Sequence, residues 1–109
     1  MAYEEISINE GIASGSTATD STKLFEEIRP PGLRKSISVQ NISTGGELVY
    51  LALSPTGPAV AGKGITLYPG GTWAQSIDAG YKPWQGRIYY ICSANTSAIS
   101  YQQTILRQV

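Results

Sequence analysis

The sequence predicts an all-β fold, a small antiparallel β-sandwich or barrel preceded by an extended N-terminal arm. From Gly32 onward, apolar and polar residues alternate with a period of two, and turn residues interrupt the alternation about every 8 to 12 positions. No helical pattern exceeds one turn. At 109 residues the chain suits one domain. We therefore expect an arm over residues 1–31 and a β-sandwich domain over 32–109.

The arm is predicted from its composition. Residues 11–24, "GIASGSTATDSTKL", are mostly small and polar, and such a segment buries too little apolar surface to offset the entropy of ordering. Before it, "YEEISI" places Ile6 and Ile8 on one side of a possible short strand.

The end of the arm contains an apolar cluster followed by two prolines. The segment "TKLFEEIRPPG" is consistent with one helical turn that points Leu24, Phe25 and Ile28 inward, and Pro30 and Pro31 stop it at once.

The domain begins with two clear strand patterns. In "KSISVQNI" (35–42), Ile37 and Val39 alternate with polar residues, and "STGG" (43–46) follows as a turn. The segment "ELVYLALS" (47–54) is apolar on both faces, as expected of a central strand or of one covered by another subunit, and is the first choice for the core.

The second half of the domain continues the alternation. A loop with two prolines and three glycines (55–64) precedes "ITLY" and "TWAQSI", which flank Pro69-Gly70-Gly71 and predict a hairpin or a sheet-crossing corner. A nine-residue loop (78–86) leads to strands in 87–94 and 98–109. About six strands are predicted after residue 31. A jelly-roll, an immunoglobulin-like sandwich and a barrel all remain open, because alternation does not give strand order.

Catalytic chemistry is poorly supported. The chain has no histidine, which removes the commonest general base and zinc ligand. Its one cysteine, Cys92, lies in an apolar strand pattern and is predicted to be a small buried hydrophobe. It cannot form an intrachain disulfide, which fits synthesis in a reducing cytoplasm. We expect no enzyme activity, no cofactor and no metal site.

Charge is distributed unevenly although the net charge is zero. Residues 1–28 contain six acidic residues and one lysine, whereas residues 29–109 contain seven basic and two acidic residues. The two parts are expected to neutralise each other within one folded unit or between copies. The dispersed basic residues argue against nucleic-acid binding. The apolar runs are far shorter than the roughly 20 residues of a membrane helix, and the acidic start does not resemble a secretory signal.

The loop "GYKPWQG" is the best binding candidate. Tyr81, Lys82 and Trp84 combine two aromatic rings and a cation, which is equipment for a protein interface or for stacking on a sugar. The alternative is that Trp84 folds back to cap an open end of the sandwich.

The order of these blocks resembles a small β-domain of tailed-bacteriophage virion accessory proteins. The similarity runs from about Arg34 to Ile105 through "VYLAL", the "AVAGKGI-L-PGG-W" block and the "G-IY-I-S" strand. The matching positions are scaffold residues, and no functional site is carried over by them: Gly62, Gly64, Pro69, Gly70, Gly71 and Gly86. The acidic arm lies outside the pattern.

The resemblance implies a virion protein made in a bacterial cytoplasm. The expected function is a capsid decoration (cement) protein that binds the shell of the major capsid protein as a symmetric homo-oligomer, such as a trimer. The alternatives are a head-fibre or tail-associated module that binds a host glycan, and a minor neck or tail connector. The candidate contacts lie in the arm and the aromatic loop: Ile6, Ile8, Leu24, Phe25, Ile28, Tyr81, Lys82 and Trp84.

Overall fold

The computed structural model describes residues 3–13, 21–29, 32–54, 58–78, 80, 82–94 and 96–108. These residues form eight strands and no helix, which confirms the predicted all-β class. The strands are β1 (Tyr3–Ala13), β2 (Thr22–Phe25), β3 (Gly32–Asn41), β4 (Val49–Leu53), β5 (Ile65–Leu67), β6 (Thr72–Ser76), β7 (Ile88–Cys92) and β8 (Ile99–Gln108).

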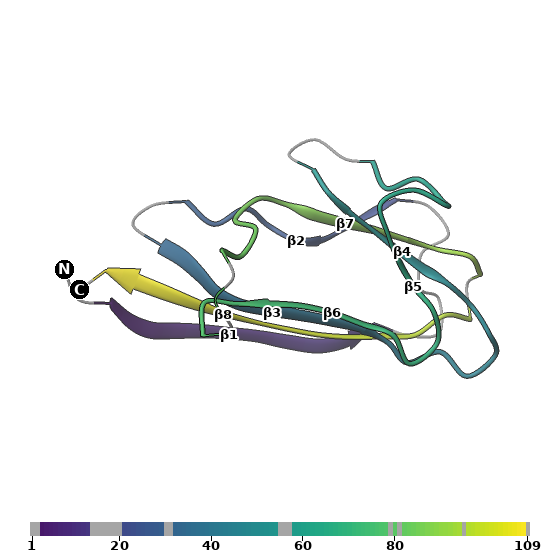
Figure 1. The fold of residues 1–109 in the computed structure, drawn as a ribbon, viewed down its shortest axis with the longest axis horizontal. Coiled ribbons are helices and arrows are strands. Elements are labelled where there is room, and N and C mark those ends of the chain that lie inside the picture. The colour runs from purple at the N-terminus through teal and green to yellow at the C-terminus, as the bar shows by residue number, and fades with distance from the viewer. Residues whose placement is uncertain are drawn as a thin grey trace.

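The strands form two four-stranded antiparallel sheets that pack face to face as a sandwich (Figure 1). The first sheet has the order β1-β8-β3-β6 and the second β2-β7-β4-β5. The start of β1 and the end of β8 lie side by side at one end of the molecule (Figure 1). The six strands predicted after residue 31 are all present within the described residues.

Most connections cross from one sheet to the other. Among consecutive strands only β4 and β5 are paired with each other, and every other step of the chain changes sheets. The strands therefore find partners that are distant in sequence, as β3 does with β8. This arrangement closes the core between the two sheets rather than within hairpins.

The turn between β5 and β6 is a sheet-crossing corner, the second of the two predicted options. Gly71 N–H donates to the carbonyl oxygen of Tyr68 at 2.7 Å, and Gly70 has a φ of 84°. With Pro69 between them this is the pattern of a type II turn, in which proline sets the first angle and glycine accepts the positive one. The turn carries the chain from the edge of one sheet to the edge of the other.

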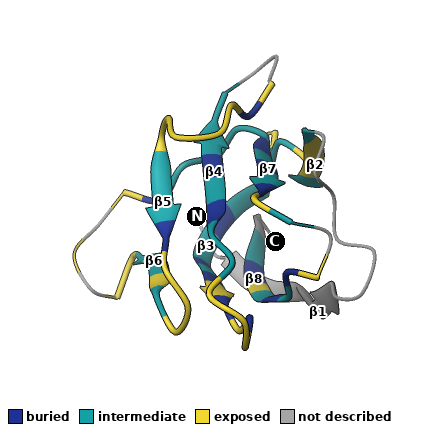
Figure 2. Ribbon diagram, turned by 90° about the vertical axis from the view of Figure 1, so that its right-hand side faces the viewer, coloured by how far each residue is buried: buried dark blue, intermediate teal, exposed yellow. Residues whose placement is uncertain are grey.

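The core consists of the inward side chains of both sheets. Val49 and Leu51 of β4 are fully buried, which confirms the prediction that this strand is central. Side chains of this kind stabilise the fold by about 1.5–3 kcal/mol each when fully buried. Figure 2 shows buried positions on β4 and β7 and also on the outermost strand β5. The hydrophobic cluster comprises Phe25, Ile37, Val39, Val49, Leu51, Leu67, Ile88, Tyr90, Cys92 and Ile99.

The helical turn predicted for the end of the arm is wrong. Thr22–Phe25 is a strand that pairs with β7, placing Thr22 opposite Tyr90 and Phe25 opposite Ile88. A single helical turn fixes several residues for one hydrogen bond, whereas edge pairing gives backbone bonds at once. Strand geometry also delivers Phe25 to the core, where it is 4% exposed.

Two strands lie within the segment predicted as an arm. β1 pairs along its length with β8 and is the outermost strand of the first sheet, and β2 is the outermost strand of the second. The division into an arm (1–31) and a domain (32–109) stays a prediction.

Candidate interaction surface

A buried arginine organises the end of the sandwich near the predicted binding loop. Arg34, on β3, is fully buried. Its Nε donates to Oε1 of Gln103 at 2.8 Å, and its Nη2 donates to the carbonyl oxygen of Glu26 at 2.9 Å. Its Nη1 donates to the carbonyl oxygens of Trp84 and Gly86. Burial lowers the pKa of Arg34 to about 10, so it stays protonated at neutral pH.

These bonds make Arg34 a structural residue rather than a ligand-binding one. The guanidinium donates toward four acceptors that come from three other parts of the chain. Gln85 completes the link, because its Oε1 accepts from the Arg34 backbone N–H at 2.6 Å and its Nε2 donates back to the Arg34 carbonyl at 3.0 Å. The loop before β7 is therefore fixed to β3.

The loop does not present Trp84 as a free aromatic face. The indole packs against the hydrophobic core and is only partly exposed. Its Nε1 donates to the carbonyl oxygen of Arg87 at 2.9 Å, and its backbone N–H donates to Oε1 of Gln75 at 3.0 Å. A Cβ on Gly86 would lie 2.5 Å from the indole, so this glycine leaves room for the ring. Trp84 thus packs inward, in line with the alternative that it folds back onto the sandwich.

The other two loop candidates lie differently. Lys82 is exposed to solvent. Tyr81 lies outside the described residues. The structure therefore does not bring the three predicted side chains together on one described surface.

The candidates in the first 31 residues also separate. Ile8 is opposite Thr104 in the β1–β8 register, Ile6 falls where that register shifts, and their side chains lie outside the described part. Leu24 and Ile28 are half-buried. The prediction that Phe25 contacts a partner is corrected, because its ring lies inside the chain's own core and is not available as an anchor.

A charged cluster joins the end of β2 to the start of β7. Glu26 accepts from Lys23 at 2.6 Å and from Arg87 at 2.8 Å. Glu27 pairs with Arg29 at 2.8 Å and with Arg87 at 3.7 Å. Hydrogen bonds from Lys23 and then Arg87 lower the pKa of Glu26 to about 2. Glu26 and Glu27 belong to the predicted arm, whereas Arg87 belongs to the predicted domain. The negative charges of these two arm residues are therefore balanced within the same chain.

Cys92 has the character predicted for it. The side chain is buried in the core at 4% exposure. Burial raises the pKa of the thiol, so it is protonated at neutral pH and packs as a small hydrophobe.

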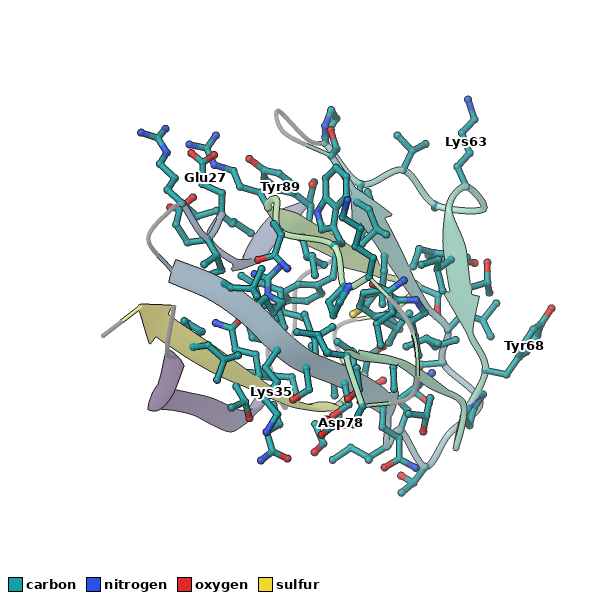
Figure 3. The ribbon with its side chains drawn as sticks, turned by 60° about the vertical axis from the view of Figure 1, so that its left-hand side comes forward. Glu27, Lys35, Lys63, Tyr68, Asp78 and Tyr89 are labelled. Atoms are coloured by element: carbon teal, nitrogen blue, oxygen red, sulfur yellow. The ribbon has the colours of Figure 1, made fainter. Side chains whose placement is uncertain are left out.

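Three of the exposed apolar side chains flank β5 and β6 along the chain, and Figure 2 shows these two strands one above the other. Tyr68, in the corner between them, is 66% exposed and projects away from the sandwich (Figure 3). Val60 before β5 and Ile77 after β6 are 45% and 40% exposed. The sequence analysis missed these side chains. The signal for Tyr68 was its position next to Pro69-Gly70, because turn residues project outward.

Within the described residues, no three histidine, cysteine or acidic side chains are placed to share a metal ion. None of the described segments is a helix long and apolar enough to span a bilayer. Comparison of the sequence with models of known protein families and with curated proteins gives no match.

Proposed function

We propose that the protein is a non-enzymatic structural component of a bacteriophage virion, a decoration protein that binds the outer surface of the major capsid protein shell and stabilises it. The observation that carries the proposal is the division between interior and surface. Buried polar groups such as Arg34 and Asn41 bond to the chain's own backbone. On the surface, by contrast, some apolar side chains, including Tyr68, and the outermost strands of both sheets face solvent.

The buried asparagine illustrates this use of polar groups. Asn41 Nδ2 donates to the carbonyl oxygens of Glu47 and Leu67, both at 2.8 Å, and its Oδ1 accepts from the Ser43 N–H at 3.0 Å. These bonds fix the turn after β3 to the end of β5. A module held rigid in this way loses little conformational entropy when it binds a partner.

The sequence resemblance adds the virion context. Several of its matching residues occupy strained or crowded backbone positions, which explains why the pattern consists of scaffold residues. Gly64 has a φ of 79° and Gly70 a φ of 84°. A Cβ at Gly71 would lie 2.9 Å from the carbonyl oxygen of Tyr68. Pro69, Gly70 and Gly71 of the shared pattern therefore specify the corner between β5 and β6.

The proposed mechanism is multivalent bridging. Each copy contributes weak contacts, and a symmetric assembly that touches several capsid subunits adds them into an avidity that no single contact provides. Candidate contacts are the N-terminal strand β1 and the exposed loop residue Lys82.

The first test is the copy number of this chain in purified particles, by quantitative mass spectrometry against the major capsid protein. A copy number comparable with that of the capsid protein supports decoration. A closed ring contains few subunits, so about a dozen copies or fewer would indicate a vertex, neck or tail. Complete absence would contradict a virion function.

A binding experiment tests the mechanism. Purified chain is added to particles that lack it, and bound protein is measured after sedimentation. Removal of residues 1–13 is expected to weaken binding, and Lys82→Ala is the matched loop variant. Equal binding by all three proteins would exclude both contact regions.

One observation bears on the glycan-binding alternative. That function requires an open aromatic face, and the exposed ring among the described aromatics is Tyr68 rather than Trp84. A weak sugar affinity that disappears in Tyr68→Ala would favour an adhesion module over decoration.

A further inference from the structure

The outermost strands of the two sheets differ in their protection against pairing with another strand. β1 contains three glutamates and a register shift, and β2 contains a lysine and a register shift. β5 has only three residues. Charges, bulges and short length all discourage edge pairing. β6 has no charged residue, no proline and no register shift against β3.

The hydrogen-bond phase of β6 is fixed at both of its ends. The N–H of Ile77 donates to the carbonyl oxygen of Lys35 at 3.0 Å, and the N–H of Asn41 donates to the carbonyl oxygen of Gly71 at 2.9 Å. In an antiparallel pair only every second residue bonds to a given neighbour. The odd-numbered residues of β6 therefore bond to β3.

The even-numbered residues of β6 direct their backbone groups the other way. Thr72, Ala74 and Ser76 point their N–H and C=O groups away from β3, on the side where no other described strand pairs with β6. Their neighbour Trp73 packs against the core, and Gln75 accepts from the loop. The inward side chains of β6 are thus occupied within the chain. At its outer edge three residues offer backbone groups that can hydrogen-bond to another strand.

We propose that this edge pairs with β6 of a second copy of the chain, antiparallel and across a two-fold axis at Ala74. Ala74 then faces Ala74 of the second copy, and Thr72 faces Ser76, so that all three outward residues exchange backbone hydrogen bonds. The two four-stranded sheets become one continuous sheet. This inference does not depend on the proposed virion function.

The sequence around β6 suits pairing with itself. The facing side chains are small and uncharged, so no like charges meet. The same register places Asp78 opposite Gly70 of the other copy, clear of that copy's own Asp78. It also places Ile77 opposite Gly71, beside the corner that carries Tyr68. The exposed Ile77 and Tyr68 thus come together at both ends of the joined strands.

A short strand edge forms a weak interface. Stable complexes bury at least about 1,000 Å², and five residues with two flanking contacts lie below that size. Dimerisation is therefore expected to depend on concentration, and sedimentation velocity over a series of protein concentrations measures it. Wild-type protein is expected to shift from monomer toward dimer as concentration rises.

Two variants separate the edge from the rest of the sheet. Ala74→Lys places two like charges face to face across the axis and is expected to raise the dimer dissociation constant at least about tenfold. Ser38→Lys is the matched control, because Ser38 neighbours Ala74 in the β3–β6 register but lies on an inner strand. It is expected to associate like wild type.

Mixing provides the specific readout. Ala74→Glu combined with Ala74→Lys is expected to restore dimers, as a heterodimer, because position 74 faces itself. Wild-type protein that stays monomeric overturns the proposal and leaves the edge for a strand of another protein. Dimers that persist in Ala74→Lys, that are lost in Ser38→Lys, or that mixing fails to restore overturn it equally.

Hydrogen exchange gives a test without variants. The Ala74 amide points outward, so its exchange in wild-type protein is expected to slow as concentration rises. Exchange that is independent of concentration contradicts pairing at this edge.

Discussion

The guanidinium carbon of Arg34 lies 5.8 Å from the centroid of the Phe25 ring, and the two residues come from opposite sheets. Phe25 also meets Tyr101 edge to face, with ring centroids 5.4 Å apart. The cation thus packs on an aromatic face inside the sandwich, a favourable arrangement when both groups are desolvated. This contact links β2 to the first sheet.

Replacing Arg34 is expected to cost more stability than replacing any exposed cation. Arg34→Met leaves the carbonyl oxygens of Trp84 and Gly86 without this donor, and we expect a loss of about 2–4 kcal/mol in the free energy of unfolding. Arg34→Lys keeps the charge but not the fork of donors, so it is expected to lose nearly as much. Urea denaturation measures both.

The control is the adjacent Lys35→Met. Lys35 pairs with the exposed Asp78 at 3.9 Å (Figure 3) and its loss is expected to change stability by less than about 1 kcal/mol. Equal losses at positions 34 and 35 would contradict the role given to Arg34.

Alternation alone does not predict the burial of Arg34. Counting back in twos from Ile37 puts residue 34 on the outer face. The β3–β8 register shifts between Arg34 and Ser36, and this bulge inserts one residue and reverses the phase. The residues of β3 after the bulge follow the alternation, and Ile37 and Val39 are both buried. A bulge has no signal of its own in a single sequence.

Acid is expected to remove the stabilisation that comes from Glu26. The pKa of its carboxyl group is lowered from 4.5 to about 2 by Lys23 and Arg87, so protonation favours the unfolded state. The contribution is present above pH 4.5 and is lost as pH falls toward 2. The difference in Tm between wild type and Glu26→Gln should therefore shrink over this range.

Salt and a second carboxamide variant check the cause. Because the cluster is exposed, added salt should reduce the same difference at neutral pH. Asp78→Asn, at a carboxylate 79% exposed, should change Tm little at any pH. A Glu26→Gln difference that does not vary with pH would contradict the electrostatic origin.

Two glycines with similar backbone angles are expected to respond differently to alanine. Gly64 and Gly70 have φ of 79° and 84°, which cost an alanine about 1–2 kcal/mol each. At Gly64 a Cβ would also lie 2.4 Å from the carbonyl oxygen of Leu51, whereas at Gly70 nothing lies within 4 Å. Gly64→Ala should therefore destabilise clearly more than Gly70→Ala in urea denaturation. Equal losses would mean that β5 moves aside freely.

The strands were predictable and their partners were not. Turn glycines and alternation located β4 and β7, but nothing local in "VYLAL" states that it lies between β5 and β7. Because nearly every connection changes sheets, the pairings depend on contacts far apart in sequence. For the same reason the sequence left open whether Trp84 faces a partner or folds back onto the sandwich, since Arg34, whose Nη1 donates to its carbonyl oxygen, lies fifty positions earlier.

Trp84 and Tyr68 are expected to separate a structural aromatic from a surface one. Trp84→Ala removes a ring packed on the core and the Nε1 bond to Arg87, and should cost about 2–3 kcal/mol. Tyr68→Ala removes a ring that is 66% exposed and should change stability by less than about 0.5 kcal/mol. Thermal and urea denaturation of the two variants provide the comparison. If Trp84→Ala were as stable as wild type, its ring would be free for a partner, and the loop would regain first place among the binding candidates. If Trp84→Ala is destabilised as expected, any loss of partner binding in that variant reflects the fold, and Tyr68→Ala becomes the informative surface mutation.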